Sequence, residues 1–288
     1  METGTAGTRF LLTPTVARLF TWGSSSMSGE GGDHGAPSPS RPHEHLRAVL
    51  SPGEVIPTAQ GGTQSFHNRV QIGLDAPTVA FPGGRAATPG TAPVSGVDHH
   101  MNSWRGFSCA GSINGVPGVL AGADTHFTWT PADGSTLTED GPFVSAFTSD
   151  LKGAHHLFWC GKNNIGEQDG ALTISDTDAM VDFTGAAERC FILGQWVTPL
   201  DSTRIARAVA RVNDHQRARY GDRFLDVQEL LSTSWGLQSP PVRALAFTAT
   251  RGRIPESVVA PDGIHLNARG NQVVVWALLE RMKQLGWI

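Results

Sequence analysis

Three short apolar runs place the strongest limit on the folds open to this chain. They are residues 18–22 (RLFTW), 156–160 (HLFWC) and 190–193 (CFIL). Such runs are typical of strands that are covered on both faces, as in a parallel sheet between layers of helices. Residues 54–58 and 224–227 are further candidates for strands of the same sheet. The chain is therefore expected to contain a buried parallel sheet.

Two amphipathic patterns predict long helices. The first is capped by Asp201 or Ser202 and continues to about Tyr220, with apolar residues at i, i+4 and i+7. The second begins near Ala268 and repeats apolar residues at i, i+4, i+8 and i+11 from Val274. Strands that alternate with helices predict an α/β chain, a three-layer α/β/α sandwich with a central parallel sheet.

The chain between the second and third strands differs in composition and in hydrophobic pattern. Residues 77–147 place Gly, Pro, Thr and Ser between short apolar pieces and lack a helical period, which favours β structure. We expect a β-rich insertion or subdomain over 77–153, and one α/β/α domain built from 1–76 and 154–288. The pattern leaves open whether the insertion is a barrel, a sandwich or a loose flap.

Composition argues against several classes of protein. The 288 residues include 22 basic and 26 acidic side chains, a net charge of −4, which argues against nucleic-acid binding. No apolar stretch reaches the roughly 18–20 residues that a membrane-spanning helix requires. The break at Pro14 argues against a signal peptide. We expect a soluble protein and leave its compartment and oligomeric state open.

Cysteine and histidine do not form recognisable metal or disulfide patterns. Cys109, Cys160 and Cys190 are far apart and odd in number, so isolated buried thiols are expected. Adjacent histidines such as His155 and His156 point to opposite faces when they lie on a strand. No metal ion or organic cofactor is expected.

Three polar segments follow strands or precede the last helix, where a parallel sheet places its active site. In GSSS at 23–26, a serine in a tight turn can project its hydroxyl into a crevice. In GKNN at 161–164, an asparagine amide can donate a hydrogen bond to an oxyanion. In DGIH at 262–265, the carboxylate can face the imidazole and fix its tautomer. Taken alone, GSSS is better explained as a flexible loop, whereas GKNN and DGIH are equally explained as an ordinary polar turn and a helix-entry loop.

Taken in order, these segments resemble the SGNH hydrolases, also called the GDSL esterases and lipases. Their blocks are Gly-Asp-Ser, a glycine after the second strand, Gly-x-Asn-Asp in mid-chain, and Asp-x-x-His before the last helix. The corresponding segments here are Gly23-Ser24-Ser25, Gly61-Gly62-Thr63, Gly161-Lys162-Asn163-Asn164 and Asp262-Gly263-Ile264-His265. Ser24 and Asn164 stand where the family has Asp. The resemblance covers roughly residues 16–76 and 154–288, and DGIHLN at 262–267 is its most specific element.

The resemblance implies a serine esterase on a flavodoxin-like sheet. Ser25 would be the nucleophile, His265 the general base and then the general acid, and Asp262 the residue that orients His265. The oxyanion hole would combine the backbone N–H groups of Ser25 and Gly62 with the side-chain amide of Asn163. This acyl-transfer chemistry requires no metal or cofactor.

Two assignments keep alternatives. Three consecutive serines leave Ser24 or Ser26 as the alternative nucleophile, although Ser25 fits the Gly-x-Ser spacing. The glycine of the oxyanion hole is assigned to Gly62 because it directly precedes the Thr-Gln-Ser turn, with Gly61 as the alternative.

The resemblance leaves the substrate open, because lipases, thioesterases and carbohydrate O-deacetylases share the same blocks. A polar, Gly-rich rim without a long apolar lid favours small-molecule or carbohydrate esters with short acyl groups, acetyl included. The insertion between Gly62 and Asn163 is expected to cover or extend the crevice and to help select the substrate. Trp22 and Trp104 are candidates for a pocket lining. The alternative function is a non-catalytic carbohydrate- or protein-binding module that retains the fold.

Overall fold

The structure of the protein is a computed structural model. It describes residues 18–29, 41–50, 54–86, 90–103, 106–134, 137–232 and 253–288. Within these ranges, no helix has both the length and the apolar character needed to cross a membrane.

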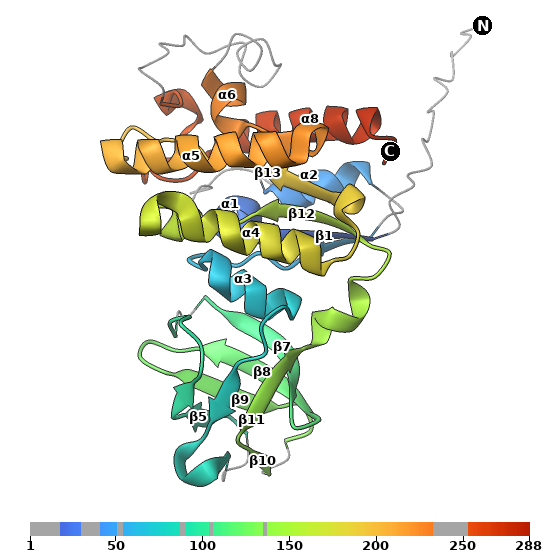
Figure 1. Cartoon of the computed structure of the whole chain (residues 1–288), viewed down its shortest axis with the longest axis vertical. Helices are drawn as coiled ribbons and strands as arrows, with labels where there is room; N and C mark the ends of the chain where they lie inside the picture. Colours follow the sequence, from blue (N-terminus) through green and yellow to red (C-terminus); the bar gives the residue numbers. More distant parts are fainter. Residues whose placement is uncertain are drawn as a thin grey trace, which may run out of the picture.

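A five-stranded parallel sheet forms the centre of the α/β part of the molecule (Figure 1). Its strands lie in the order β14-β13-β12-β1-β2, and every neighbouring pair is parallel. Their bounds are β1 (Arg18–Gly23), β2 (Glu54–Pro57), β12 (His155–Trp159), β13 (Cys190–Leu193) and β14 (Phe224–Leu225). The prediction of an α/β chain with a parallel central sheet is confirmed.

Helices pack on both faces of this sheet. Leu19 and Leu157 lie in a core with side chains of α2, α6 and α8, whereas Phe20 and Phe158 lie in a second core with side chains of α3, α4 and α5. The alternation follows from the two-residue period of a strand, and it explains why these strands are apolar throughout. The helices are α2 (Pro42–Val49), α3 (Ser65–Ile72), α4 (Ala171–Phe183), α5 (Thr203–Tyr220), α6 (Val227–Ser232) and α8 (Ala268–Gln284).

The chain between β2 and β12 forms a second sheet, here called the β unit, within residues 78–145. Seven strands lie in the order β5-β9-β8-β7-β11-β3-β6, and their pairings are antiparallel. Their bounds are β3 (Thr78–Ala80), β5 (Ala92–Val94), β6 (Gly96–Val97), β7 (Ser108–Ile113), β8 (Val116–Gly122), β9 (Phe127–Pro131) and β11 (Gly141–Ser145). The short strands β4 (Arg85–Ala86) and β10 (Thr138–Glu139) form a separate pair.

Helix α3 joins the two parts of the molecule. Phe66 and Val70 belong to the core of the β unit, together with Phe107 and Trp129, whereas Ile72 belongs to a core of the parallel sheet. Figure 1 shows α3 lying between α4 and the β unit. The helix that follows the GGT segment therefore has apolar contacts on both sides.

Two elements differ from the sequence expectation. The strand expected at 224–227 ends at Leu225, and Val227 already begins α6. The carboxylate of Asp226 accepts the N–H of Glu229, which favours a helix start at this point. Helix α4 was not anticipated, because it buries the polar side chains Thr173 and Asp176 and so lacks a clear apolar stripe.

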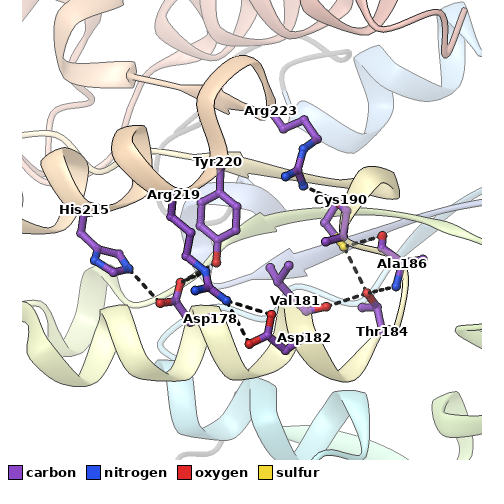
Figure 2. A network of polar contacts seen from close by, with 11 residues as sticks. Asp178, Val181, Asp182, Thr184, Ala186, Cys190, His215, Arg219, Tyr220 and Arg223 are labelled. Carbon is purple, nitrogen blue, oxygen red and sulfur yellow. Dashed lines mark hydrogen bonds and ion pairs between the residues drawn. The ribbon is translucent and has the colours of Figure 1, made fainter.

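A polar network joins α4 to α5 (Figure 2). The Asp178 carboxylate accepts a hydrogen bond from the Tyr220 hydroxyl and lies 2.8 Å from Nε2 of His215. Arg219 forms ion pairs with Asp178 at 3.2 Å and with Asp182 at 2.8 Å. The network fixes the end of α5, where Gly221 follows with a φ of 54°.

This network predicts an abnormal titration of Tyr220, the single tyrosine of the chain. Burial, together with the adjacent Asp178 carboxylate, raises the pKa of the phenol. Phenolate absorbance of the native protein is therefore expected only well above pH 10, whereas the urea-unfolded chain titrates near about pH 10. Because the folded pKa is the higher one, this contribution to stability is lost as the pH rises above about 10.

The control is Tyr220→Phe, which must abolish the phenolate signal. A native protein whose tyrosine absorbance titrates at the same pH as the unfolded chain would contradict the network as described.

Candidate active site

The proposed nucleophile lies directly after the first strand of the sheet. Strand β1 ends at Gly23, whose φ is +151°, and a Cβ at this position would lie 2.4 Å from the carbonyl oxygen of Trp159 in β12. Glycine therefore allows the ends of β1 and β12 to approach closely. The short helix α1 (Ser25–Ser28) begins immediately afterwards and carries Ser25.

Ser25, His265 and Asp262 form a chain of hydrogen bonds. Nε2 of His265 is 2.7 Å from Oγ of Ser25, and Nδ1 of His265 is 2.6 Å from Oδ2 of Asp262. The structure thus brings together side chains that lie 240 residues apart in the sequence. The geometry allows His265 to accept the hydroxyl proton of Ser25 while Asp262 holds the imidazole in place.

The turn that carries Asp262 and His265 is closed by backbone contacts. A β-bridge joins Val259 to Leu266, and the N–H of Ala260 donates to the carbonyl of His265 at 2.8 Å. Leu266 is buried in the core that α8 covers, which anchors the turn to the sheet.

The Asp262 carboxylate is held in its ionised form. Oδ1 accepts the N–H groups of Ile264 at 2.9 Å and of His265 at 3.0 Å. Partial burial alone would raise the pKa of Asp262, but the hydrogen bonds from the His265 ring and from the two N–H groups outweigh it. The pKa therefore lies below its usual value.

The three consecutive serines differ in their surroundings. Ser24 is completely buried, and neither its hydroxyl nor that of Ser26 has a hydrogen-bond partner within the described residues. Ser25 is 8% exposed, and its hydroxyl contacts His265. The geometry therefore favours Ser25 over both alternatives.

The segment that contains Gly62 forms a turn beside the end of β1. The carbonyl of Gln60 accepts the N–H of Thr63 at 3.4 Å and its hydroxyl at 2.8 Å. Gly62 has a φ of +75°, which glycine adopts without strain, and the turn is therefore built around Gly62. The Thr63 hydroxyl also contacts the carbonyl of Gly23 at 3.2 Å, so this turn, here called the Gly62 turn (residues 60–63), is tied to the end of β1.

Asn163 reaches the same turn from the third strand of the sheet. It lies in the 3-10 turn η3 (Lys162–Asn164) after β12, and its Nδ2 donates to the carbonyl of Thr63 at 2.8 Å. Gly61, the alternative glycine, belongs to the same turn. The structure therefore links Gly62 and Asn163 to Ser25 through Thr63 and the carbonyl of Gly23.

Asn164 differs from its neighbour in burial and in contacts. It is 1% exposed, its Oδ1 accepts the N–H of Ser65 at 3.1 Å, and its Nδ2 donates to the Ser65 hydroxyl at 2.9 Å. Ser65 in turn contacts the buried carboxylate of Asp176. Through Ser65, Asn164 thus fixes the start of α3 against α4. No local pattern in the sequence predicts this contact.

Lys162 is a further polar residue of this region that the sequence did not single out. Its ammonium is 2.8 Å from the carbonyl of Trp196 and 3.0 Å from the Asp201 carboxylate. Burial lowers the pKa of Lys162, and the neighbouring carboxylate opposes that shift. Its contacts hold the segment after β13 against the Asn163 turn.

Other features singled out by the sequence lie elsewhere. Trp22 is fully buried between Phe20 and Phe158 in a core of the sheet, so its assignment to a pocket lining is wrong. Trp104 lies outside the described residues. The three cysteines are free and buried, as expected, and burial raises the pKa of Cys109 to about 12.

The adjacent histidines His155 and His156 contact aromatic side chains of the two cores of the sheet. His156 is buried against Phe20, whereas His155 contacts Trp287 near the end of the chain, so the two rings lie on opposite faces of the sheet. Among the residues that the structure describes, no group of three or more His, Cys, Asp or Glu side chains is placed to hold a metal ion.

Comparison with known proteins adds little to this geometry. No protein-family model and no curated protein matches the chain. A solved structure described as "Crystal Structure of TesA" is similar, with 13% identity and a TM-score of 0.49. The alignment covers 93% of this chain and 99% of that one. At this level of similarity, no residue role is carried over from that protein.

Replacing each of the two adjacent asparagines is expected to change the free energy of unfolding by different amounts. Asn164→Ala leaves the buried N–H of Ser65 without its acceptor and should lower the free energy of unfolding by about 1–3 kcal/mol. Asn163→Ala removes one part-buried hydrogen bond of an exposed side chain and should cost about 1 kcal/mol or less. Urea unfolding of both variants, compared at equal m-value, measures the difference. A loss at Asn163 as large as that at Asn164 would contradict the separation of roles.

Proposed function

We propose that this protein is a serine ester hydrolase. The observation that carries the proposal is the continuous contact from Ser25 through His265 to Asp262, placed directly after β1 of the parallel sheet. Active sites of open α/β sheets lie at the carboxyl ends of the strands. The chain order of the blocks and the DGIHLN segment support a place among the SGNH hydrolases, with their three-layer α/β/α sandwich.

The chemistry is a two-step acyl transfer. Ser25 Oγ attacks the ester carbonyl carbon while Nε2 of His265 takes its proton, and the C=O π bond opens to an oxyanion. Collapse of this intermediate breaks the bond to the leaving alcohol, which receives the proton from His265. Water then attacks the acyl-enzyme with His265 again as the base, and the acid and free Ser25 are released.

Three donors are proposed to stabilise the oxyanion: the N–H of Ser25, the N–H of Gly62 and the amide of Asn163. Two features support this set. Gly62 has the positive φ that shapes its turn, and Asn163 lies at hydrogen-bond distance from the adjacent residue Thr63. One hydrogen of the Asn163 amide is directed to Thr63, which leaves the second hydrogen for a substrate oxygen.

We place short acyl esters, including acetylated carbohydrates, as the substrate class. A surface cavity of about 410 Å³ lies beside Asn163. Its lining includes the charged side chains of Lys162, Glu167 and Arg204, which suit a hydroxyl-rich substrate better than a long alkyl chain. The inserted segment over 77–153 is proposed as a subdomain at the rim of the active-site crevice.

Covalent labelling tests the proposed function. A fluorophosphonate probe is expected to label the wild-type protein at Ser25, because the probe requires a hydroxyl activated by a neighbouring base. Ser25→Ala should abolish labelling, and the controls Ser24→Ala and Ser26→Ala should retain it. An unlabelled wild-type protein would favour the non-catalytic binding module. Loss of labelling in a control variant would assign the nucleophile to the serine replaced in that variant.

A series of p-nitrophenyl esters tests the substrate class. The value of kcat/KM is expected to fall steeply from acetate to octanoate, because the charged side chains beside Asn163 interrupt the apolar area that an alkyl chain could bury. The expected decrease is about tenfold or more. A preference for octanoate would exclude the short-acyl assignment and favour a lipase or a long-chain thioesterase.

A further inference from the structure

Gln60 is the first residue of the Gly62 turn and connects this turn to the parallel sheet. Its backbone N–H donates to the carbonyl of Gly23 at 3.2 Å, and its own carbonyl accepts the N–H and the hydroxyl of Thr63. The main chain of Gln60 therefore determines where Gly62 lies relative to Gly23, the last residue of β1. Gly23 lies two residues before Ser25.

The side chain of Gln60 extends in the other direction, to the β unit. Its Oε1 accepts the N–H of Ser108 at 2.7 Å, and its Nε2 donates to the carbonyl of the same residue. Ser108 is the first residue of β7, whose register pairs it with Ala121 of β8. Because one planar amide pairs with both backbone groups of one residue, this contact fixes the orientation of the side chain as well as its position.

A second contact of the same kind lies a few residues further on. The N–H of Gln64 donates to Nδ1 of His67 at 3.1 Å, so the proton of a neutral His67 ring is on Nε2, which donates to the carbonyl of Asn102 at 3.0 Å. Burial lowers the pKa of His67 to about 4, which keeps the ring neutral near pH 7. The segment from the turn into α3 is thus attached to the β unit at two points.

We propose that Gln60 is a positioning residue for the ester hydrolysis proposed above, on which this inference rests: it holds the N–H of Gly62 toward the developing oxyanion by pairing with Ser108 of the β unit. The β unit then contributes to catalysis by bracing the Gly62 turn, in addition to any contact with substrate. An oxyanion donor acts only within a few tenths of an ångström of its best position, and a shift of about 1 Å can cost about 10² in rate.

Two variants of Gln60 test this role. Gln60→Leu removes both hydrogen bonds at similar volume and should lower kcat for p-nitrophenyl acetate by about tenfold to hundredfold. Its KM should change by less than about threefold, because the contact acts in the transition state. Affinity for a phenylboronic acid, which forms a tetrahedral anion on the serine, should fall in parallel with kcat.

Gln60→Glu gives a second measurement, the pH dependence of kcat, which would not change if Gln60 had only a structural role. The ionised carboxylate that this substitution introduces would repel the Ser108 carbonyl, whereas the protonated acid can accept the Ser108 N–H and donate to the carbonyl as glutamine does. The ratio of variant to wild-type kcat should therefore rise as the pH falls below about 5. Taking the ratio at each pH removes the titration of His265 common to both proteins.

The matched control is Asn114→Gly, at the opposite end of β7. It removes the contacts of Nδ2 with the carbonyls of Glu139 at 3.2 Å and Asp140 at 2.9 Å, and glycine accepts the φ of 49° found there. This variant should lower the thermal midpoint of the protein and leave kcat within about twofold.

The outcomes separate the two proposals. If the wild-type protein labels with fluorophosphonate and turns over the ester while Gln60→Leu matches it in kcat, the positioning role is overturned and the proposed function stands. A loss of kcat in Asn114→Gly equal to that in Gln60→Leu would also overturn it, since general weakening of the β unit would then explain both. A wild-type protein that neither labels nor turns over an ester would overturn the proposed function together with this inference.

Discussion

The carbonyl oxygen of Gly23 is the contact on which the candidate site depends. It lies 3.2 Å from each of three donors: the N–H of Gln60, the amide of Asn68, and the hydroxyl of Thr63, which it shares with the carbonyl of Gln60. One backbone group at the end of β1 thus holds the Gly62 turn and the side of α3 in fixed positions beside Ser25. A side chain on residue 23 would collide with the Trp159 carbonyl, so glycine at this position is a requirement of the architecture.

The fold could be predicted where burial is apolar and periodic. Strands β1, β12 and β13 are apolar on both faces because two separate cores cover them, and α8 repeats its apolar residues at the helical spacing. The same reasoning failed for α4, whose inward positions include Thr173 and Asp176. Their partners, the carbonyl of Gly161 and the side chains of Ser65 and Arg69, are supplied only by the folded chain.

The candidate site was also predictable from the sequence only in part. The general rule that residues after parallel strands share one edge of the sheet singled out the segments that contain Ser25, Asp262 and His265, and the resemblance to the SGNH hydrolases selected these three residues within them. The burial of Asn164 beside an exposed Asn163 does not follow from the sequence, because adjacent identical residues differ only in what surrounds them. The pairing of Gln60 with Ser108 joins residues 48 positions apart through a single side chain, and no periodicity or motif signals it.

Helix α3 explains why such a site is rigid before substrate arrives. Its first turn is bound by Asn164 through Ser65, its middle contributes Phe66 and Val70 to the core of the β unit, and its end contributes Ile72 to the core of the parallel sheet. Movement of the Gly62 turn relative to Ser25 would have to displace a helix packed into two cores, and close-packed interiors resist such displacement. Donors that are already fixed require no reorganisation as charge develops, and this is the physical advantage that the proposed catalysis would gain from inserting a β unit at this point of the sheet.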